Sequence, residues 1–263
     1  MVKPFEDRVA WITGASSGIG EALARQLAEG GARLVLSARR AEKLEALAAG
    51  LGPSRARVVP LDVADTAAAG KNTEAALAAF GRVDLMVHGA GISQRARIVQ
   101  TALEVDRRIM EVNYFGVVAL TKAILPAMVQ ARGGRFVVLS SVTGYVGTPY
   151  RSGYAASKHA LHGFFESLRA EHAADGIEVT MVCPGFVNTD IITHALHGDG
   201  REHGVKEATH SGAMSAEACA ARIVRAVRAG RPELYVGRES VGIWLRRYAP
   251  AVLRTALRHV KTT

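Results

Sequence analysis

The sequence has little cysteine, no long apolar run and no apolar leader at its start. Its 263 residues include two cysteines, Cys183 and Cys219, so a disulfide framework and a CxxC motif are both excluded. No uninterrupted apolar run approaches the roughly 18 residues of a membrane span. The first residues, M-V-K-P-F-E-D, lack the apolar centre of a signal peptide. We therefore expect a protein of the reducing cytoplasm.

Acidic residues are also scarce relative to basic ones, with 24 Asp and Glu against 33 Lys and Arg, a net charge of +9. Such a balance can indicate nucleic-acid binding. The excess is uneven, however, because the last stretch, 238–263, holds six basic residues and a single acid, Glu239. The remainder is only mildly basic and contains no nucleic-acid-binding motif, so we expect no nucleic-acid partner.

Short apolar runs alternate with longer helical patterns along the whole chain. The runs predict strands at 8–12, 33–37, 57–61, 83–87, 135–139, 178–182 and 233–236. The patterns between them predict helices at 21–29, 41–49, 66–80, 102–130, 153–174 and 215–228. This alternation predicts an α/β protein with a doubly wound Rossmann fold: a seven-stranded, mainly parallel sheet with helices on both faces. No linker divides the chain, and its length suits one domain.

A glycine-rich stretch, T-G-A-S-S-G-I-G at 13–20, joins the first strand to the first helix. Glycines allow a tight turn and close approach of a ligand, and a helix N-terminus offers unpaired N–H groups to phosphate. The spacing is G-x-x-x-G-x-G rather than the commoner G-x-G-x-x-G. By itself it is compatible with a phosphate seat or with a turn that binds nothing.

Tyr154 and Lys158 lie four residues apart on a predicted helix and therefore share one face. An ammonium near a phenol favours phenolate and lowers the phenol's pKa, which would make Tyr154 a proton donor. The alternative is an ordinary surface pair. Ser141 follows the fifth strand, at the edge where such sheets bind ligands, and its hydroxyl could bond a carbonyl oxygen. Its alternative is a serine in the Ser140-Ser141 turn.

These motifs occur in a fixed order together with Gly89-Ala90-Gly91, Asn113 and Pro184-Gly185. In that order the chain resembles the short-chain dehydrogenase/reductase family, in its single-domain branch, over residues 8–237. The resemblance implies hydride transfer between a nicotinamide and a carbonyl or secondary alcohol. It assigns catalytic roles to Asn113, Ser141, Tyr154 and Lys158. The 13-residue separation from Tyr154 matches the family for Ser141 and not for Ser140.

Each of these four has an implied role. Tyr154 would be the acid or base, and Ser141 would hold the carbonyl oxygen. Lys158 would bind the nicotinamide ribose and lower the Tyr154 pKa. Asn113 would anchor a water that links Lys158 to solvent; otherwise it is a polar residue inside a helix, for which Asn is a poor former.

The resemblance also implies a set of cofactor-binding residues. They are Gly14, Ser16, Ser17, Gly18, Ile19, Gly20, Arg39, Asp62, Val63, Gly89, Ala90, Gly91, Tyr154, Lys158, Pro184, Gly185, Val187 and Thr189. Asp62 would contact the adenine ring, unless it only caps the next helix. Thr189 would bind the nicotinamide carboxamide.

The end of the second strand indicates which nucleotide is bound. Family members that prefer NAD carry Asp where this chain has Ala38, and no acid occurs in Ser37-Ala38-Arg39-Arg40. Arg39 can pair with a 2′-phosphate, and Ser16 can add a hydroxyl. The alternative for the two arginines is a solvated helix start. We expect NADP(H) rather than NAD(H).

The chain departs from the family at His88, where Asn is usual; we expect His88 to brace the sheet in another way and not to be catalytic. A segment rich in Gly and His, 191–214, interrupts the regular pattern, and we expect a substrate lid over about 186–214. His194, His197, His203 and His210 crowd it. Because no cysteine or close carboxylate set accompanies them, we expect no metal site.

A basic amphipathic extension, 238–263, follows the catalytic domain, 1–237. Its apolar residues recur at steps of three and four and are Trp244, Leu245, Tyr248, Val252, Ala256 and Val260. Its basic residues cluster opposite and are Arg247, Arg254, Arg258 and Lys261. Pro250 predicts a division into two helices. Such an extension can lie on an anionic membrane, pack on a partner subunit or cover the substrate mouth.

The sequence thus favours an NADPH-dependent carbonyl reductase, or the reverse alcohol dehydrogenase, with an apolar or lipid-like substrate. One alternative is a 3-oxoacyl-thioester reductase of fatty-acid metabolism. Another is a non-catalytic nucleotide-binding or interaction protein on the same fold, although such proteins typically lose the Tyr or Lys that this chain keeps. The resemblance further implies a homodimer or homotetramer.

Overall fold

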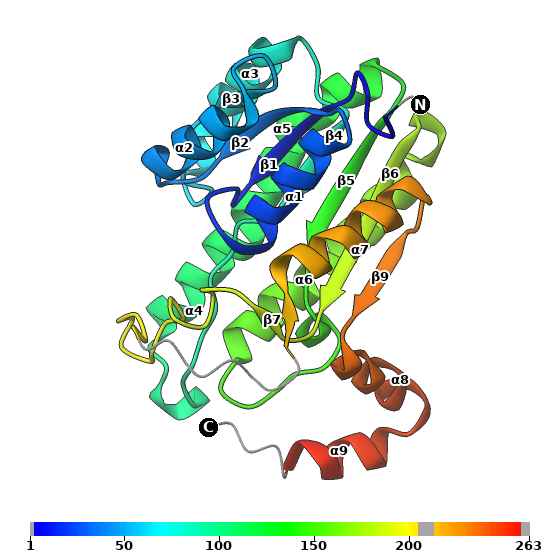
Figure 1. Cartoon of the computed structure of the whole chain (residues 1–263). Helices are drawn as coiled ribbons and strands as arrows, with labels where there is room; N and C mark the ends of the chain where they lie inside the picture. Colours follow the sequence, from blue (N-terminus) through cyan, green and yellow to red (C-terminus); the bar gives the residue numbers. More distant parts are fainter. Residues whose placement is uncertain (1–2, 205–212, 259–263) are drawn as a thin grey trace.

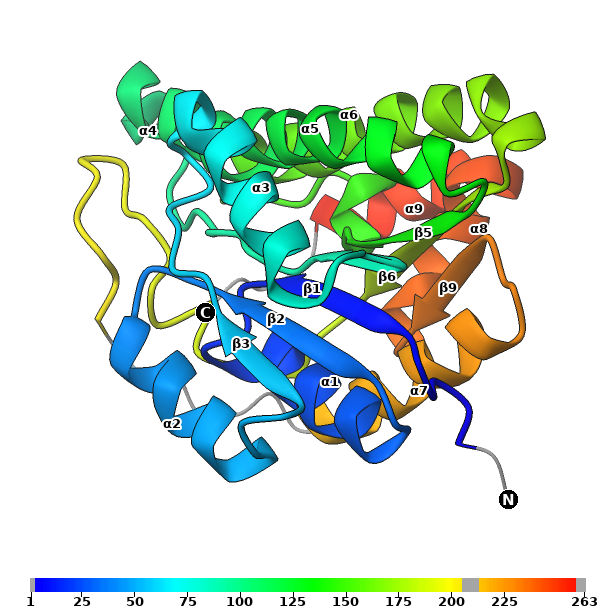
Figure 2. The same cartoon turned by 90° about the horizontal axis from the view of Figure 1, so that it is seen from above.

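The computed structural model describes residues 3–204 and 213–258, which form a parallel sheet between two layers of helices (Figures 1 and 2). The seven strands are β1 (Val9–Thr13), β2 (Arg33–Ser37), β3 (Ala56–Val58), β4 (Leu85–His88), β5 (Gly134–Leu139), β6 (Ile177–Pro184) and β9 (Glu233–Val236). Their order is β3-β2-β1-β4-β5-β6-β9, and every pairing is parallel. The predicted Rossmann fold is therefore confirmed.

Two cores lie on opposite faces of the sheet because successive strand residues point to opposite sides. Ala10 and Ile12 enter one core, whereas Val9 and Trp11 enter the other. The first core is covered by α1 (Gly18–Glu29), α2 (Ala41–Leu51) and α7 (Ala216–Arg228). The second is covered by α3 (Ala69–Phe80), α5 (Gly116–Gln130) and α6 (Ser152–Glu171), and α4 (Leu103–Met110) packs against α6 in the same layer. Figure 2 shows the two layers on either side of the strands.

Two predicted elements differ in detail. The third strand ends at Val58 rather than residue 61, because Pro60 has no N–H to donate, although Val59 and Leu61 still donate to Leu36 and Ala38. The predicted helix 102–130 is interrupted by a π-helical turn, Glu111–Phe115, between α4 and α5. Such turns often occur at functional sites.

The stretch that includes this turn, Leu103–Gln130, is long and apolar enough in the described residues to pass a test for a membrane-spanning helix. The sequence prediction, based on uninterrupted apolar runs, did not single it out. Its inner side chains, including Leu120, Ile124 and Met128, are buried in the second core. The core helix of a globular protein passes the same test.

The segment predicted as an irregular lid is more ordered than expected at its ends. Two short strands, β7 (Val187–Asn188) and β8 (Met214–Ser215), pair in parallel, and residue 196 bridges to both Gln94 and Glu202. The Leu196 N–H donates to the Ser93 carbonyl at 2.9 Å, which fixes this segment on the loop after β4. His210 lies outside the described residues.

The C-terminal extension forms two helices, α8 (Val241–Tyr248) and α9 (Pro250–Arg258), divided at Pro250 as predicted. Val260 and Lys261 lie outside the described residues.

Candidate active site

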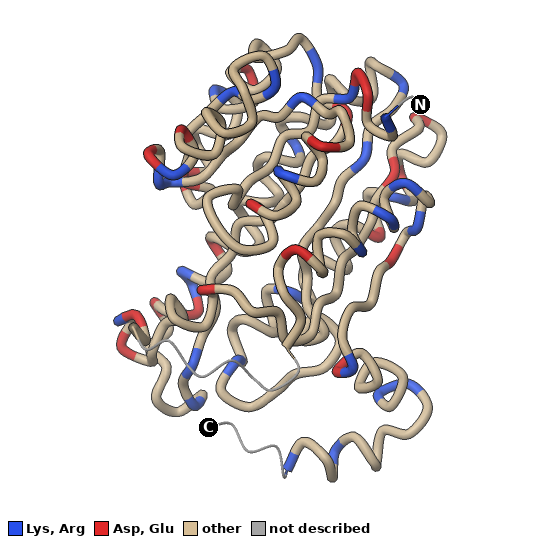
Figure 3. Tube along the Cα trace, viewed as in Figure 1, with Lys and Arg blue, Asp and Glu red and all other residues tan. Residues whose placement is uncertain are grey.

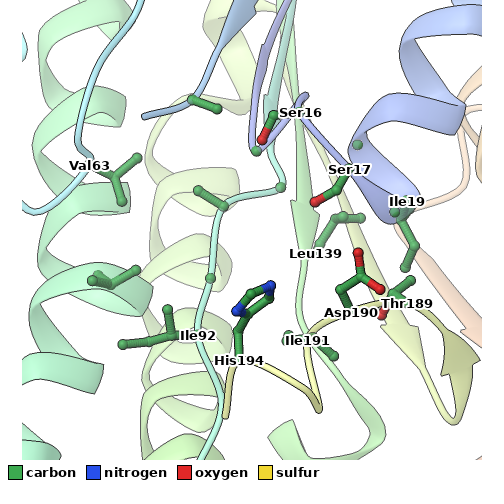
Figure 4. A pocket seen from close by; sticks show the side chains of 18 of the residues that line it. Ser16, Ser17, Ile19, Val63, Ile92, Leu139, Thr189, Asp190, Ile191 and His194 are labelled. Atoms are coloured by element: carbon green, nitrogen blue, oxygen red, sulfur yellow. The ribbon is translucent and has the colours of Figure 1, made fainter. Parts of the chain in front are cut away.

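A cavity of about 450 Å³ opens at the carboxyl edge of the sheet, where the strand order reverses between β1 and β4. This reversal is where open α/β sheets bind their ligands. Every residue predicted to bind the cofactor lines the cavity, and Ser141, Tyr154 and Lys158 line it too. Asn113 does not line the cavity and lies behind Gly91, which does. Figure 4 shows residues of the glycine-rich turn facing lid residues across the cavity.

The glycine-rich turn is packed backbone to backbone on the turn after β4. Gly14 has φ +71°, and a Cβ there would lie 2.7 Å from the backbone of Gly89 and Ala90. A Cβ on Gly20 would lie 2.3 Å from the Gly14 carbonyl oxygen. Thr13 Oγ1 accepts from the Gly89 N–H at 3.2 Å and joins the two turns. Only glycine fits at positions 14 and 20, so packing within the protein requires these two glycines of the G-x-x-x-G-x-G motif.

The first turn of α1 lines this cavity through Gly18, Ile19 and Gly20. Ser17 is the N-cap residue of α1, yet its side chain makes no capping hydrogen bond. Uncapped N–H groups and the helix dipole form a seat for phosphate oxygens. The site therefore fits the pyrophosphate of a dinucleotide by its own geometry.

The end of the cavity that lies after β2 is bordered by Ala38, Arg39 and Arg40. Arg40 Nη2 donates to Ser16 Oγ at 3.1 Å and to Ser17 Oγ at 3.0 Å, so it lies over the glycine-rich turn. The sequence prediction named Arg39 and treated Arg40 only as part of a basic pair. Arg40 reaches this turn because β2 pairs with β1, so that the ends of the two strands lie side by side. The spacing of residues along the sequence does not predict this contact.

Asp62 and Val63 line the cavity next to this end. Asp62 Oδ1 accepts from the Ala64 N–H at 3.0 Å, and Arg108 Nη2 lies 3.8 Å from its other oxygen. The side chain that caps the following helical turn is Asp65, which accepts from the Ala68 N–H. The alternative role of Asp62 as a helix cap is therefore wrong.

Tyr154 and Lys158 project from one turn of α6, and both are buried. Lys158 Nζ lies 5.7 Å from the Tyr154 ring centroid and donates to the Leu139 carbonyl at 2.7 Å. Burial lowers the pKa of Lys158 to about 8, because desolvation disfavours the ammonium.

The expected lowering of the Tyr154 pKa is wrong for this geometry. Burial raises the pKa of the phenol, and this desolvation outweighs the opposing effects of the Arg151 charge and a hydrogen bond with Ser141. A nearby ammonium favours the phenolate, but removing the phenolate from water disfavours it, and whether Tyr154 is buried cannot be read from its spacing to Lys158.

The two adjacent serines point to different partners. Ser141 Oγ accepts from the Thr143 N–H at 3.1 Å and donates to the Pro184 carbonyl oxygen at 3.4 Å. Ser140 Oγ pairs with His162 Nε2 at 2.9 Å. The hydroxyl beside Tyr154 is thus the one selected by the sequence spacing.

Asn113 is fully buried in the π-helical turn and braces two parts of the site. Its amide oxygen accepts from the Ile92 N–H at 2.9 Å, and Nδ2 donates to the Ile92 carbonyl at 2.9 Å and to Ser157 Oγ at 3.0 Å. The loop after β4 is thereby held against the helix that carries Tyr154 and Lys158.

His88 is buried in the second core and does not line the cavity. Its Nε2 pairs with Thr121 Oγ1 at 2.8 Å, and its ring stacks on Phe136 at an interplanar angle of 2°. Burial, assisted by the charge of Lys158, lowers its pKa to about 3. A neutral imidazole therefore joins β4 to α5.

The cavity is also lined by residues to which the sequence assigned no individual role. Among them are Ile92, Asp190, Ile191, His194 and Glu202, all of which except Ile92 lie in the predicted lid. His194 Nδ1 pairs with Glu202 Oε2 at 2.8 Å, and its ring points into the cavity (Figure 4). No motif marks these residues, because the chain is irregular there and brings them together only on folding.

His197 and His203, the other two lid histidines that the structure describes, contact each other. His203 Nδ1 lies 3.1 Å from His197 Nε2. Within residues 3–204 and 213–258, no group of three or more His, Cys, Asp or Glu is placed to hold a metal ion.

Comparisons with known proteins agree with this geometry. A family model described as "short chain dehydrogenase" matches residues 8–199. "Dehydrogenase/reductase SDR family protein 7-like" of Anopheles gambiae is 42% identical over 254 residues, covering 93% of this chain and 80% of that protein. "Dehydrogenase/reductase SDR family member 7B" of Bos taurus is 42% identical over 254 residues, covering 93% and 78%. A solved short-chain dehydrogenase from Streptomyces avermitilis matches with TM-score 0.82 and 32% identity, over 95% of this chain and 94% of that chain.

Proposed function

The chain belongs to the short-chain dehydrogenase/reductase family, and on that premise we propose that it is an NADP(H)-dependent carbonyl reductase or alcohol dehydrogenase. The observation that carries this proposal is that Ser141, Tyr154 and Lys158 line one cavity together with the glycine-rich turn. The family normally binds a nicotinamide cofactor, which supplies or accepts the hydride when bound.

Each side chain has a part in the proposed reaction. The Tyr154 phenol donates its proton to the carbonyl oxygen as hydride reaches the carbon, and takes it back in the alcohol direction. Ser141 donates a hydrogen bond to the same oxygen. With a pKa of about 8, Lys158 is largely ammonium at neutral pH, and its role is to bind the nicotinamide ribose hydroxyls. Asn113 holds the loop after β4 against α6 and so positions the pair.

The preference for NADP(H) rests on charge at the adenosine end. Ala38, Arg39 and Arg40 border that end, and Arg40 already binds two hydroxyls of the glycine-rich turn. Two guanidinium groups without a competing acid at the end of β2 favour a 2′-phosphate.

The substrate is proposed to be an apolar or lipid-like carbonyl compound. Ile92, Val187 and Ile191 line its side of the cavity, and the polar pair His194 and Glu202 also lines it. A 3-oxoacyl thioester is the alternative substrate, and non-catalytic nucleotide binding is the alternative role. We further propose a cytoplasmic homodimer or homotetramer, to be measured by light scattering with size-exclusion chromatography.

NADPH oxidation against a panel of ketones, aldehydes, steroids and 3-oxoacyl thioesters, repeated with NADH, tests the proposal. We expect turnover of an apolar ketone or aldehyde with a clear preference for NADPH. Turnover confined to acyl thioesters would support the alternative enzyme. Tight NADPH binding without turnover of any member of the panel would favour the non-catalytic role.

A further inference from the structure

The last two helices carry an exposed apolar surface. On α8, Trp244 is 56% exposed and Tyr248 is 71% exposed, and their rings stack with centroids 5.9 Å apart. Val241 and Val252 are also exposed and extend this surface along α8 and onto α9. Single exposed apolar residues are ordinary. Here they occur on two consecutive helices in which no residue is buried, which marks an interaction surface.

A second exposed apolar surface lies in the 3₁₀ turn Ile98–Gln100 and at the start of α4. Ile98 is 75% exposed and Val99 is 91% exposed, and Leu103 adds to them. Figure 1 shows this part of the chain and α8–α9 at the same end of the molecule, toward which β5 and β9 point. The candidate active site also opens at this carboxyl edge.

The charge of α8 and α9 has one sign. They contain Arg246, Arg247, Arg254 and Arg258, and no Asp or Glu occurs from 241 to 258. Figure 3 shows blue segments and no red along both helices. Arg246 Nη1 contacts His159 Nε2 at 2.9 Å and ties α8 to α6. Arg247 lies 6.0 Å from the centroid of the Tyr248 ring. An aromatic ring beside an arginine suits a lipid headgroup layer, where the ring enters and the guanidinium pairs with phosphate.

We propose that α8, α9 and the turn Ile98–Gln100 form a docking face for an anionic membrane surface. Charge selects this occupant, because the same face on a second copy would bring two cationic helix pairs together. An anionic bilayer satisfies the apolar and the cationic groups at once. Docking at this end would turn the mouth of the cavity toward the lipid. Only this last consequence, entry of substrate from the bilayer, rests on the proposed function.

Vesicle sedimentation of the full chain tests the docking face. We expect sedimentation with vesicles of phosphatidylcholine and phosphatidylglycerol, and little with phosphatidylcholine alone. The chain has two tryptophans, and Trp11 is fully buried, so a change in emission reports on Trp244. Its emission should shift to the blue when anionic vesicles are added. Equal binding to both vesicles, or no binding to either, would overturn the proposal.

Two double variants and a matched control locate the contact. Trp244→Ser with Tyr248→Ser, and Arg247→Glu with Arg254→Glu, alter exposed side chains, and each should weaken anionic-vesicle binding on the order of tenfold or more. Arg228→Glu with Arg231→Glu makes the same change in net charge beside the start of β9, at the opposite edge of the sheet, and should bind like the parent. Circular dichroism checks that each variant is folded.

If the control variant lost as much binding to anionic vesicles as the arginine variant, the loss would reflect net charge alone, and the proposal would be contradicted. A parent dimer that ignores vesicles and dissociates in the two face variants would assign the face to a second copy instead. Tyr154→Phe should bind vesicles like the parent, so failure of the proposed chemistry and failure of docking give different results.

Discussion

Two buried imidazoles, His88 and His162, lie behind the candidate active site, and both are held neutral. Burial lowers the pKa of His88 to about 3 and that of His162 to about 4, from the usual value near 6.5. In the unfolded chain both imidazoles bind protons below about pH 6.5, whereas in the folded chain they do so only near pH 3 to 4. Their contribution to stability is therefore complete above pH 6.5 and is lost as the pH falls toward those values.

His88→Asn should make the protein less sensitive to acid. Between pH 7.5 and 4.5, protonation of this one histidine in the unfolded chain lowers the free energy of unfolding by on the order of 2 to 3 kcal/mol. The Asn variant should lack this part of the decrease. Urea unfolding of parent and variant at the two pH values measures it, and the difference within each protein cancels any constant cost of the substitution. The same loss in both proteins would contradict the account of His88.

Ala38→Asp should change the nucleotide preference. A carboxylate at the end of β2 would accept hydrogen bonds from the adenosine ribose hydroxyls and repel a 2′-phosphate. We expect kcat/KM with NADPH to fall about tenfold or more and the value with NADH to rise. Ala38→Ser is the matched control, because it adds a polar atom without charge. An unchanged ratio in the Asp variant would place the 2′-phosphate elsewhere.

Individual site residues were predictable where a motif fixes them. The sequence spacing of Tyr154, Lys158 and Ser141 predicts how they lie relative to one another, since a helix and a strand end have fixed geometry. The pKa of Tyr154 and the role of Arg40 were not predictable in this way. Both depend on what surrounds the side chain after folding, namely burial for one and a neighbouring turn for the other.

Among the elements, the helical stretch from α4 to α5 shows how packing positions chemistry. Its π-helical turn places Asn113 toward the loop after β4. Gly116 follows this turn directly and lies close to the backbone of Val63. A Cβ added to Gly116 would lie 2.1 Å from the Val63 carbonyl oxygen. A helix pattern predicts neither the π turn nor this contact, because both arise between segments that are distant in sequence.

Gly116→Ala should destabilise the protein by about 1 to 3 kcal/mol, because the added methyl forces backbone apart. It should also weaken NADPH binding, since Val63 lines the cavity. Gly163→Ala is the control: it lies within α6, its added Cβ meets nothing within 4 Å, and it should stabilise by about 0.5 to 1 kcal/mol. Thermal melts and NADPH titration compare them. If Gly116→Ala melted at the same temperature as the parent, α5 would be able to shift away from Val63 without loss of stability, contrary to this prediction.

For the whole molecule, the sheet was predictable because apolar runs, glycine stops and right-handed crossovers leave few topologies. The observed strand order follows from them. The lid was predictable only as an interruption. Its contacts, such as Leu196 with Ser93, are between irregular segments that carry no periodic signal. The two C-terminal helices were predictable from amphipathic spacing and Pro250, whereas their position at the carboxyl edge was not.

The most direct test of the central claim is single-turnover reduction of a carbonyl substrate by the parent and by Tyr154→Phe, with NADPH binding measured in both. The account predicts a loss of about 10² to 10⁴-fold in the rate of hydride transfer, because the proton donor is gone. NADPH affinity should change little. A variant that turns over like the parent would contradict the assignment of Tyr154 and the mechanism built on it.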